Sequence, residues 1–166
     1  MRRVFRVLVL FTILLAAPSG VRPAQALDRA FASFPPGTIV IRTAERRLYL
    51  LTGNGEPLSY PVAVGKPGNK WIGERSIDGK YIRPAWQAPP GLRSSAGSHV
   101  IPGGSPANPM GAAALTLSGG EYAIHGTNNP NSIGTFASNG CIRMHNSDIM
   151  DLYQRVRVGT RVVVLP

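Results

Sequence analysis

Apolar and polar residues alternate in short runs from residue 38 onward, and Gly, Pro and Asn separate the runs. Alternation with a period of two is typical of β-strands, so we expect strands at 38–43, 47–52 and 58–64. A Gly-Asn-Gly turn at 53–55 favours a hairpin between the second and third strands. The pattern therefore predicts a strand-rich architecture.

The stretch from 65 to 109 carries much of the Gly and Pro of the chain. Because Pro fixes φ and removes a backbone donor, we expect loops and edge strands here. Aromatic residues such as Trp71, Tyr81 and Trp86 can anchor the stretch. We therefore expect an ordered region that lines a groove, with disorder as the alternative.

The strand pattern resumes at 115–117 and 122–124, and the second run leads directly into His125. Further on, apolar residues recur at helical spacing and predict a helix, whose apolar stripe consists of Ile149, Leu152, Tyr153 and Val156.

Polar residues and Gly mark the ends of this helix. Asn146 or Ser147 can cap its start, and Asp148 lies in the first turn, where negative charge is favoured. Gly159 ends it, and a closing strand is expected at 160–165. Together these elements predict a mainly β, sandwich-like domain with one helix.

The amino terminus has the pattern of a secretory signal peptide. Basic residues begin the chain, an apolar run covers 7–17, and small residues stand at 24 and 26, which predicts cleavage after Ala26. The run is shorter than the roughly 20 residues of a membrane-spanning helix, so an uncleaved anchor is only the alternative. We expect a signal peptide at 1–26, a short segment at 27–37 and one domain at 38–166.

Composition narrows the class of protein. With 166 residues and 43% hydrophobic content, the chain has room for one domain with an ordinary core. Removal of 1–26 would delete four arginines and no acids, so the net charge would fall from +10 to +6. This charge suits an anionic envelope surface or simple solubility. The arginines are dispersed rather than clustered with aromatics, so we do not expect nucleic-acid binding.

Cys141 is the only cysteine. In an oxidising exported compartment a structural cysteine normally has a partner, so this thiol indicates either intermolecular pairing or catalysis. His125 precedes it across a turn-rich loop that can fold back and bring imidazole and thiol together. An adjacent imidazolium would lower the pKa of the thiol, and the imidazole could later protonate a leaving amine.

Two neighbours of Cys141 add to this interpretation. Gly140 allows a substrate carbonyl to approach the backbone, so the amides around Gly140 and Cys141 could form an oxyanion hole. Arg143 is suited to bidentate pairing with a substrate carboxylate. A metal site with His125, Cys141 and His145 is the weaker alternative, because zinc sites usually show close pairs of ligands. We expect no metal and no cofactor.

Two motifs, HGTNNPNSIG at 125–134 and SNGCIRMHN at 138–146, resemble the active-site signature of the YkuD-type L,D-transpeptidase catalytic domain. The resemblance extends to YPVAVGK at 60–66, NPMG at 108–111 and GTRVVV at 159–164, and covers roughly 38–165. It implies a β-rich fold in which Cys141 is the nucleophile and His125 is the general base and acid.

The resemblance also implies that the carbonyl of Gly126 orients the imidazole and that Ser138, Gly140 and Arg143 line the substrate site. Asn139 departs from the pattern, because many members have a second His there. The departure puts any role for a second imidazole in doubt, and Asn139 could at most donate a hydrogen bond.

The reaction that the resemblance implies has two steps and takes place in the periplasm or cell-wall space. Cys141 attacks the diamino-acid carbonyl of a peptidoglycan tetrapeptide stem and releases the terminal D-Ala. An acceptor then takes the acyl group from the thioester. The acceptor could be an amine of a neighbouring stem, which gives a 3→3 cross-link, a protein lysine, or water, which gives carboxypeptidase activity. A non-catalytic wall-binding module and a disulfide-linked dimer are the competing interpretations.

Overall fold

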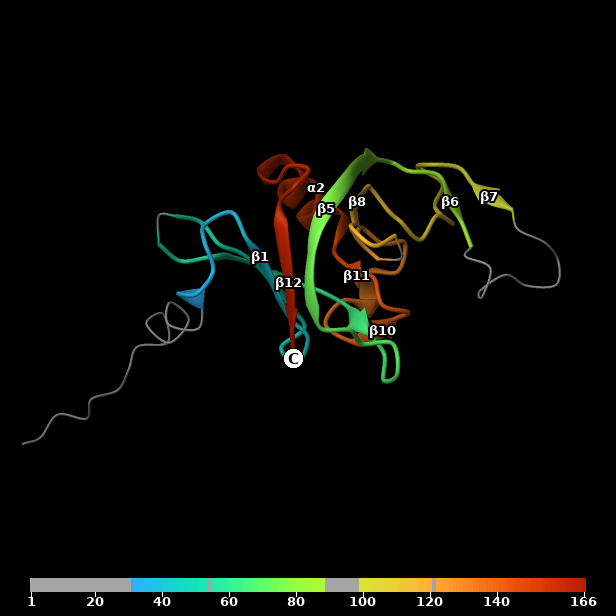
Figure 1. Ribbon diagram of the computed structural model, residues 1–166. Helices are drawn as coiled ribbons and strands as arrows, with labels where there is room; N and C mark the ends of the chain where they lie inside the picture. Colours follow the sequence, from blue (N-terminus) through green and yellow to red (C-terminus); the bar gives the residue numbers. More distant parts are fainter. Residues whose placement is uncertain (1–30, 54, 89–98, 121) are drawn as a thin grey trace, which may run out of the picture.

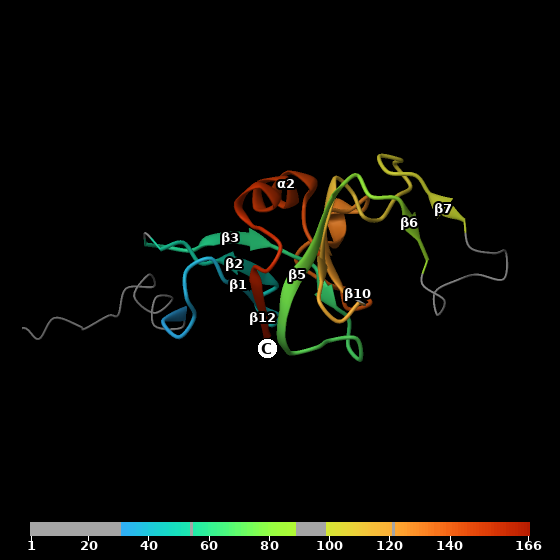
Figure 2. The same cartoon turned by 45° about the horizontal axis from the view of Figure 1, so that its top comes forward.

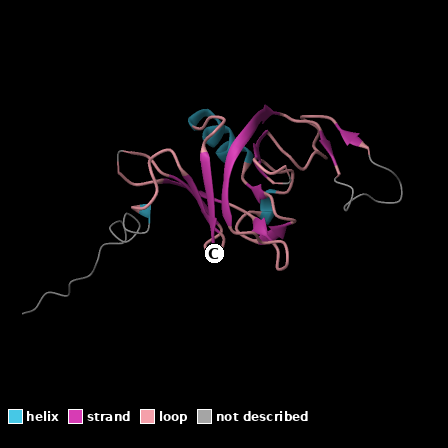
Figure 3. Cartoon of the chain, viewed as in Figure 1, coloured by secondary structure: helices cyan, strands magenta, loops and turns pink. Residues whose placement is uncertain are grey.

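The computed structural model describes residues 31–53, 55–88, 99–120 and 122–166. Within these residues no helix is long and apolar enough to cross a membrane. The predicted signal peptide lies outside the described residues. The mainly β fold is confirmed, as the abundance of strands in Figure 3 shows.

The first three predicted strands form an antiparallel meander. They are β1 (Ile39–Arg42), β2 (Arg47–Leu50) and β3 (Leu58–Pro61), and the predicted hairpin joins β2 to β3. The closing strand β12 (Arg161–Leu165) pairs in parallel with β1, as Ile39 opposite Val162 shows. The predictions for these strands are confirmed.

The prediction of loops and edge strands from 65 to 109 is wrong in its first part. β5 (Gly73–Ile82) is a long strand in the middle of the large sheet, between β12 and β8 (Ala113–Leu117). Along β5 only Ile77 and Gly79 are buried. Because most of its side chains are not buried, β5 has a polar sequence with two Gly residues. Such a sequence is typical of a loop, although the strand is central in the sheet.

β5 also connects the two halves of the fold (Figure 1). Its residues 73–76 pair with β12, and its residues 77–82 pair with β8. The register shifts between Ile77 and Gly79, which indicates an irregularity of the β-bulge type where the strand passes from one partner to the other. The sheet order is β11-β9-β8-β5-β12-β1-β2-β3.

The remaining strands are short. β9 (Ala123–His125) and β11 (Ile142–Arg143) complete the large sheet at one edge. β10 (Phe136–Ser138) pairs with β4 (Val64–Gly65), and β6 (Trp86–Gln87) pairs with β7 (Val100–Ile101). In both views β6 and β7 stand away from the β1–β3 meander (Figures 1 and 2). A 3-10 turn, η2 (Pro130–Ser132), follows β9.

Helix α2 (Asn146–Arg155) covers the main core. Ile149 and Leu152 are fully buried, so the predicted stripe is confirmed. The predicted cap is not: His145 holds the N-cap position without a side-chain cap bond, and Asn146 is the first helical residue. The Asn146 side chain bonds instead to the loop that follows β9.

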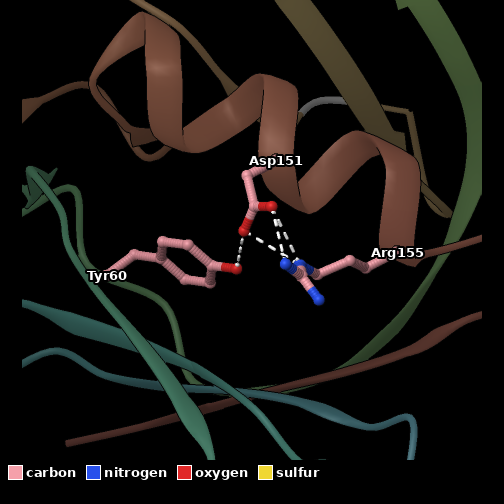
Figure 4. Close-up of polar contacts among 3 residues, drawn as sticks. All are labelled: Tyr60, Asp151 and Arg155. Atoms are coloured by element: carbon pink, nitrogen blue, oxygen red, sulfur yellow. Dashed lines mark hydrogen bonds and ion pairs between the residues drawn. The ribbon is translucent and has the colours of Figure 1, made fainter.

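Asp151 of α2 contacts both the β3 strand and Arg155 of its own helix (Figure 4). The Tyr60 hydroxyl of β3 donates to Asp151 at 2.6 Å, and Arg155 pairs with the same carboxylate at 2.8 Å.

A smaller core cluster, formed by Phe31, Val40, Tyr49 and Leu51, is separate from the main one.

Candidate active site

Neighbouring strands bring the predicted base and nucleophile to one face of the sheet. β9 and β11 are parallel, with Ile142 opposite Ile124 and Arg143 opposite His125. Side chains alternate along a strand, so Cys141, just before β11, falls beside Ala123 and on the same face as His125 and Arg143. The backbone hydrogen bond that Ala123 makes to the Cys141 thiol agrees with this register. The sheet therefore makes imidazole and thiol diagonal neighbours.

His125 is buried, with 4% of its surface exposed. Its Nδ1 lies 2.7 Å from the carbonyl oxygen of Gly126. A carbonyl can only accept, so Nδ1 donates and Nε2 carries the lone pair of a neutral ring. Burial lowers the pKa of His125 to about 4, and the Arg143 cation acts in the same direction. The imidazole is thus a neutral base in the resting protein.

The Cys141 thiol, like His125, is neutral because of burial. It is free, and burial raises its pKa above the ordinary value, although the Ala123 backbone and the Arg143 charge partly oppose this. The prediction that an imidazolium lowers the pKa of the thiol is therefore wrong for the resting site. Desolvation disfavours both charged forms, so the neutral pair is the stable one.

Ser138 organises the turn that carries Cys141. Its hydroxyl is buried, donates to the Cys141 carbonyl at 2.5 Å and accepts from the Gly140 N–H at 3.1 Å. Ser138 therefore holds the turn rather than presenting a free hydroxyl. Asn139 is exposed, and its Oδ1 accepts from Asn69 at 3.1 Å. The structure places Asn139 at the outer side of this turn.

Gly140 has φ +121°, a conformation that favours glycine. A Cβ here would also overlap the ring of Tyr122. The Gly140 carbonyl accepts from the indole Nε1 of Trp71 at 2.9 Å. Trp71 was predicted only as an anchor, and no local pattern in the sequence indicates that it bonds to the residue before Cys141.

Asn146 holds the loop that orients the imidazole. Its Oδ1 accepts from the amides of Ala112 at 3.0 Å and Thr127 at 3.1 Å, and its Nδ2 donates to the Thr127 carbonyl at 3.0 Å. A Cβ on Gly126 would overlap this Oδ1. Gly126 thus allows the close approach that fixes its own carbonyl against His125.

Arg143 is tied to the fold by its main chain. Its N–H and carbonyl exchange hydrogen bonds of 2.9 Å with Ala63. Its side chain lies on the His125 face, by the register above, and its charge acts on both His125 and Cys141. A guanidinium so placed can meet an anionic group that approaches the thiol. His145 is the N-cap residue of α2, and within the described ranges no three His, Cys, Asp or Glu residues form a group that could hold a metal.

A cleft of about 560 Å³ lies next to the loop after His125. Asn108 fixes its wall, because the buried Asn108 amide donates to the carbonyls of Pro84, Ile101 and Pro102. The lining contains one cation and no carboxylate, and consists of Arg83, Gly104, Ser105, Pro106, Asn108, Gly111, Ala112, Thr127, Asn128, Pro130 and Asn146. The Gly/Pro-rich region therefore lines a hollow beside the loop that follows His125, although His125 and Cys141 are not part of its lining.

Comparison with known proteins gives a consistent result. The sequence profile described as the L,D-transpeptidase catalytic domain matches residues 36–164. YqjB of Bacillus subtilis, named as an L,D-transpeptidase, is 36% identical over 132 residues, which cover 76% of this chain and 69% of YqjB. ErfK/SrfK of Escherichia coli, named likewise, is 36% identical over 138 residues, covering 76% of this chain but 43% of ErfK/SrfK. The chain thus spans less than half of that relative.

A solved structure shares the fold. L,D-transpeptidase 3 from Mycobacterium tuberculosis, in complex with a faropenem-derived adduct, superposes with a TM-score of 0.62 and covers 78% of this chain and 60% of its own. Its sequence is 14% identical, so the likeness concerns the architecture alone.

Proposed function

The chain belongs to the L,D-transpeptidase catalytic domain family, and from this we propose that it is a cysteine acyltransferase that acts on peptidoglycan tetrapeptide stems. The observation that carries the proposal is the shared face of β9 and β11, where a neutral buried imidazole lies diagonally from the thiol. We also propose that the chain is exported through its amino-terminal signal and acts in the periplasm or cell-wall space.

In the first step the Cys141 sulfur attacks the carbonyl of the diamino-acid residue while His125 Nε2 takes the thiol proton. A carbon–sulfur bond forms, the carbon–nitrogen bond to the terminal D-Ala breaks, and the imidazolium returns the proton to the leaving amine. Because the resting pair is neutral, the charge arises only during the attack. The Gly126 carbonyl, bonded to Nδ1, stabilises the imidazolium at that moment.

In the second step an acceptor amine attacks the thioester. His125 takes a proton from the amine, the new amide forms, and the departing sulfur regains the proton. An amine of a neighbouring stem yields a 3→3 cross-link, and a protein lysine yields a tethered protein. With water as acceptor the product is a tripeptide stem, which is the carboxypeptidase alternative.

The tetrahedral intermediate needs donors for its oxyanion. The Gly140 N–H is already bonded to Ser138 at 3.1 Å, so we assign this role first to the Cys141 N–H. We propose that Arg143 pairs with a carboxylate of the stem, since its charge already acts at the thiol. Asn139, on the exposed side of the turn, can donate a hydrogen bond to the same substrate.

Mass spectrometry of products from a purified disaccharide-tetrapeptide tests the proposal. We expect loss of D-Ala and either a cross-linked dimer or a tripeptide, and no turnover by Cys141→Ser or by His125→Ala. Retention of wild-type rates by either variant would refute the assignment. Release of D-Ala with the tripeptide as the sole product would instead favour the carboxypeptidase.

Faropenem gives a test that needs no acceptor. The M. tuberculosis structure holds a faropenem-derived adduct. We propose that faropenem acylates the Cys141 thiol of this chain, so the intact mass should increase in the wild type and stay constant in Cys141→Ser. Binding of peptidoglycan without any acylation or turnover would support a non-catalytic wall-binding module. A reducible dimer would indicate disulfide pairing instead.

A further inference from the structure

The peptide unit between Gly140 and Cys141 presents two groups: the Cys141 N–H, which we assign to the oxyanion, and the Gly140 carbonyl, which contacts Trp71. The indole Nε1 of Trp71 donates to the Gly140 carbonyl at 2.9 Å. The described residues contain no cis peptide bond, so this unit is planar and trans, and its carbonyl and N–H point in opposite directions. A bond that fixes the Gly140 carbonyl therefore also fixes the direction of the Cys141 N–H.

This peptide unit needs an external restraint. Gly140, at φ +121°, lacks the Cβ that limits rotation in other residues. Ser138 holds the peptide on the other side of Gly140, through the Gly140 N–H at 3.1 Å. Trp71 provides the side-chain bond to the peptide that follows.

Trp71 is itself held rigidly. Its ring stacks on Tyr122 with centroids 4.9 Å apart and 9° between the planes. The Arg75 guanidinium carbon lies 5.8 Å from the centroid of the Trp71 ring. Tyr122 also fills the space where a Cβ of Gly140 would lie. Trp71, Tyr122 and Gly140 therefore pack together next to Cys141.

We propose that Trp71 is a positioning residue that aims the Cys141 N–H at the oxyanion by holding the Gly140 carbonyl. This inference rests on the proposed acyl-transfer function. Trp71 acts through Gly140 and exchanges no proton with the reacting groups. Its contribution belongs to the intermediate, in which the oxygen carries charge, more than to substrate binding.

Trp71→Phe tests this role, because a phenyl ring keeps the stack on Tyr122 and lacks the N–H. We expect acylation by faropenem and kcat on the tetrapeptide to fall about tenfold or more, with KM within about twofold of the wild type. Alkylation of Cys141 by iodoacetamide should keep its rate and pH profile, because it forms no oxyanion. Tyr49→Phe is the matched control: it also loses one aromatic donor, the hydroxyl bonded to Glu45 at 2.7 Å in the small core cluster, and should show wild-type kinetics.

Wild-type kcat in Trp71→Phe would overturn the positioning role. An equal fall of alkylation and acylation would also overturn it, because that result means general disorder of the turn. If Trp71→Phe loses its circular dichroism signal, β-(3-benzothienyl)alanine at position 71 keeps the fused ring without the N–H and gives the same comparison. A wild type that is neither acylated nor active would refute the proposed function itself.

Discussion

The two ends of helix α2 are held by different chemistry. At the amino-terminal end the neutral amide of Asn146 makes three hydrogen bonds of 3.0 to 3.1 Å to Ala112 and Thr127. These bonds tie the helix to the loop that orients His125. The amino-terminal end of α2 is therefore part of the candidate active site.

The carboxy-terminal end is held by charges. The Lys80 ammonium of β5 donates to the carbonyls of Tyr153 at 2.6 Å and Val156 at 2.5 Å, where a cation also complements the helix dipole. In the same part of α2, Arg155 pairs with Asp151 at 2.8 Å, with both side chains more than 40% exposed. Salt and acid act on these groups.

The difference shows where precision is needed. The dipole of an amide does not change with salt or with moderate pH, so Asn146 keeps the Gly126 carbonyl in place under many conditions. Exposed ion pairs are screened and contribute little, so the other end can change without moving the site. We infer that the neutral end controls geometry and the charged end contributes stability alone.

Acid should have the largest effect, and it acts on the buried His125 rather than on the Asn146 amide. The pKa of His125 is about 4 in the folded chain, against about 6.5 when unfolded, so the unfolded chain takes up the proton first as the pH falls. The contribution of His125 to the free energy of unfolding should therefore have its maximum value above pH 6.5. It should decrease by about 3 kcal/mol on acidification to pH 4. Urea unfolding at a series of pH values measures this slope.

His125→Gln is the matched variant, because glutamine does not titrate. Its free energy of unfolding should be nearly constant across the same window. An equally steep slope in His125→Gln would assign the effect to other groups. The rate of acylation by faropenem in the wild type should fall in the same direction, since only the neutral imidazole can accept the thiol proton.

Asn146→Ala should have the next largest effect. It removes all three bonds of the clamp, so the Gly126 carbonyl loses its support, and we expect kcat to fall about tenfold to a hundredfold with a loss of about 1 to 2 kcal/mol of stability. Asn146→Asp keeps an acceptor for the two amides and loses only the donor to Thr127, so its kcat should be intermediate. Steady-state kinetics and chemical unfolding of the three proteins test the order, and equal kcat in all three would contradict it.

Much of this fold follows from local pattern. The meander β1–β3, the closing strand β12 and the buried stripe of α2 were predicted because alternation and helical spacing are properties of neighbouring residues. The register of β9 and β11 puts His125 and Cys141 on one face of the sheet, while their joint role in catalysis stays a prediction drawn from residue types. These features depend on contacts within one strand or between adjacent ones.

The remaining features depend on distant partners. Trp71 bonds to Gly140 across 69 positions of the sequence, and Asn146 bonds to Thr127 across 19. No local sequence pattern indicates which partner either side chain has. The central strand β5 was missed because its polar and Gly residues are typical of loops. The neutral His125 and Cys141 pair was missed because desolvation depends on the packing of the whole domain.

Lys80→Met tests the charged end of α2. The methionine keeps most of the apolar stem but removes the ammonium that binds two carbonyls at the end of the helix and lies 4.2 Å from the centroid of the Tyr153 ring. We expect a loss of about 1 kcal/mol of stability and no change in kcat. Thermal unfolding and steady-state kinetics measure both. A tenfold fall in kcat with unchanged stability would reverse the roles assigned to the two ends.

Asp151→Asn should have the smallest effect and tests how weak the charged end is. The asparagine oxygen can still accept from Tyr60, while the pairing with Arg155 loses its charge. Because both partners are exposed, the loss should be a few tenths of a kcal/mol, and about 1 M NaCl should produce a similar loss in the wild type but not in the variant. If salt instead lowers the stability of both proteins equally, the salt-sensitive charge lies elsewhere, and the ion pair in Figure 4 contributes nothing measurable to the fold.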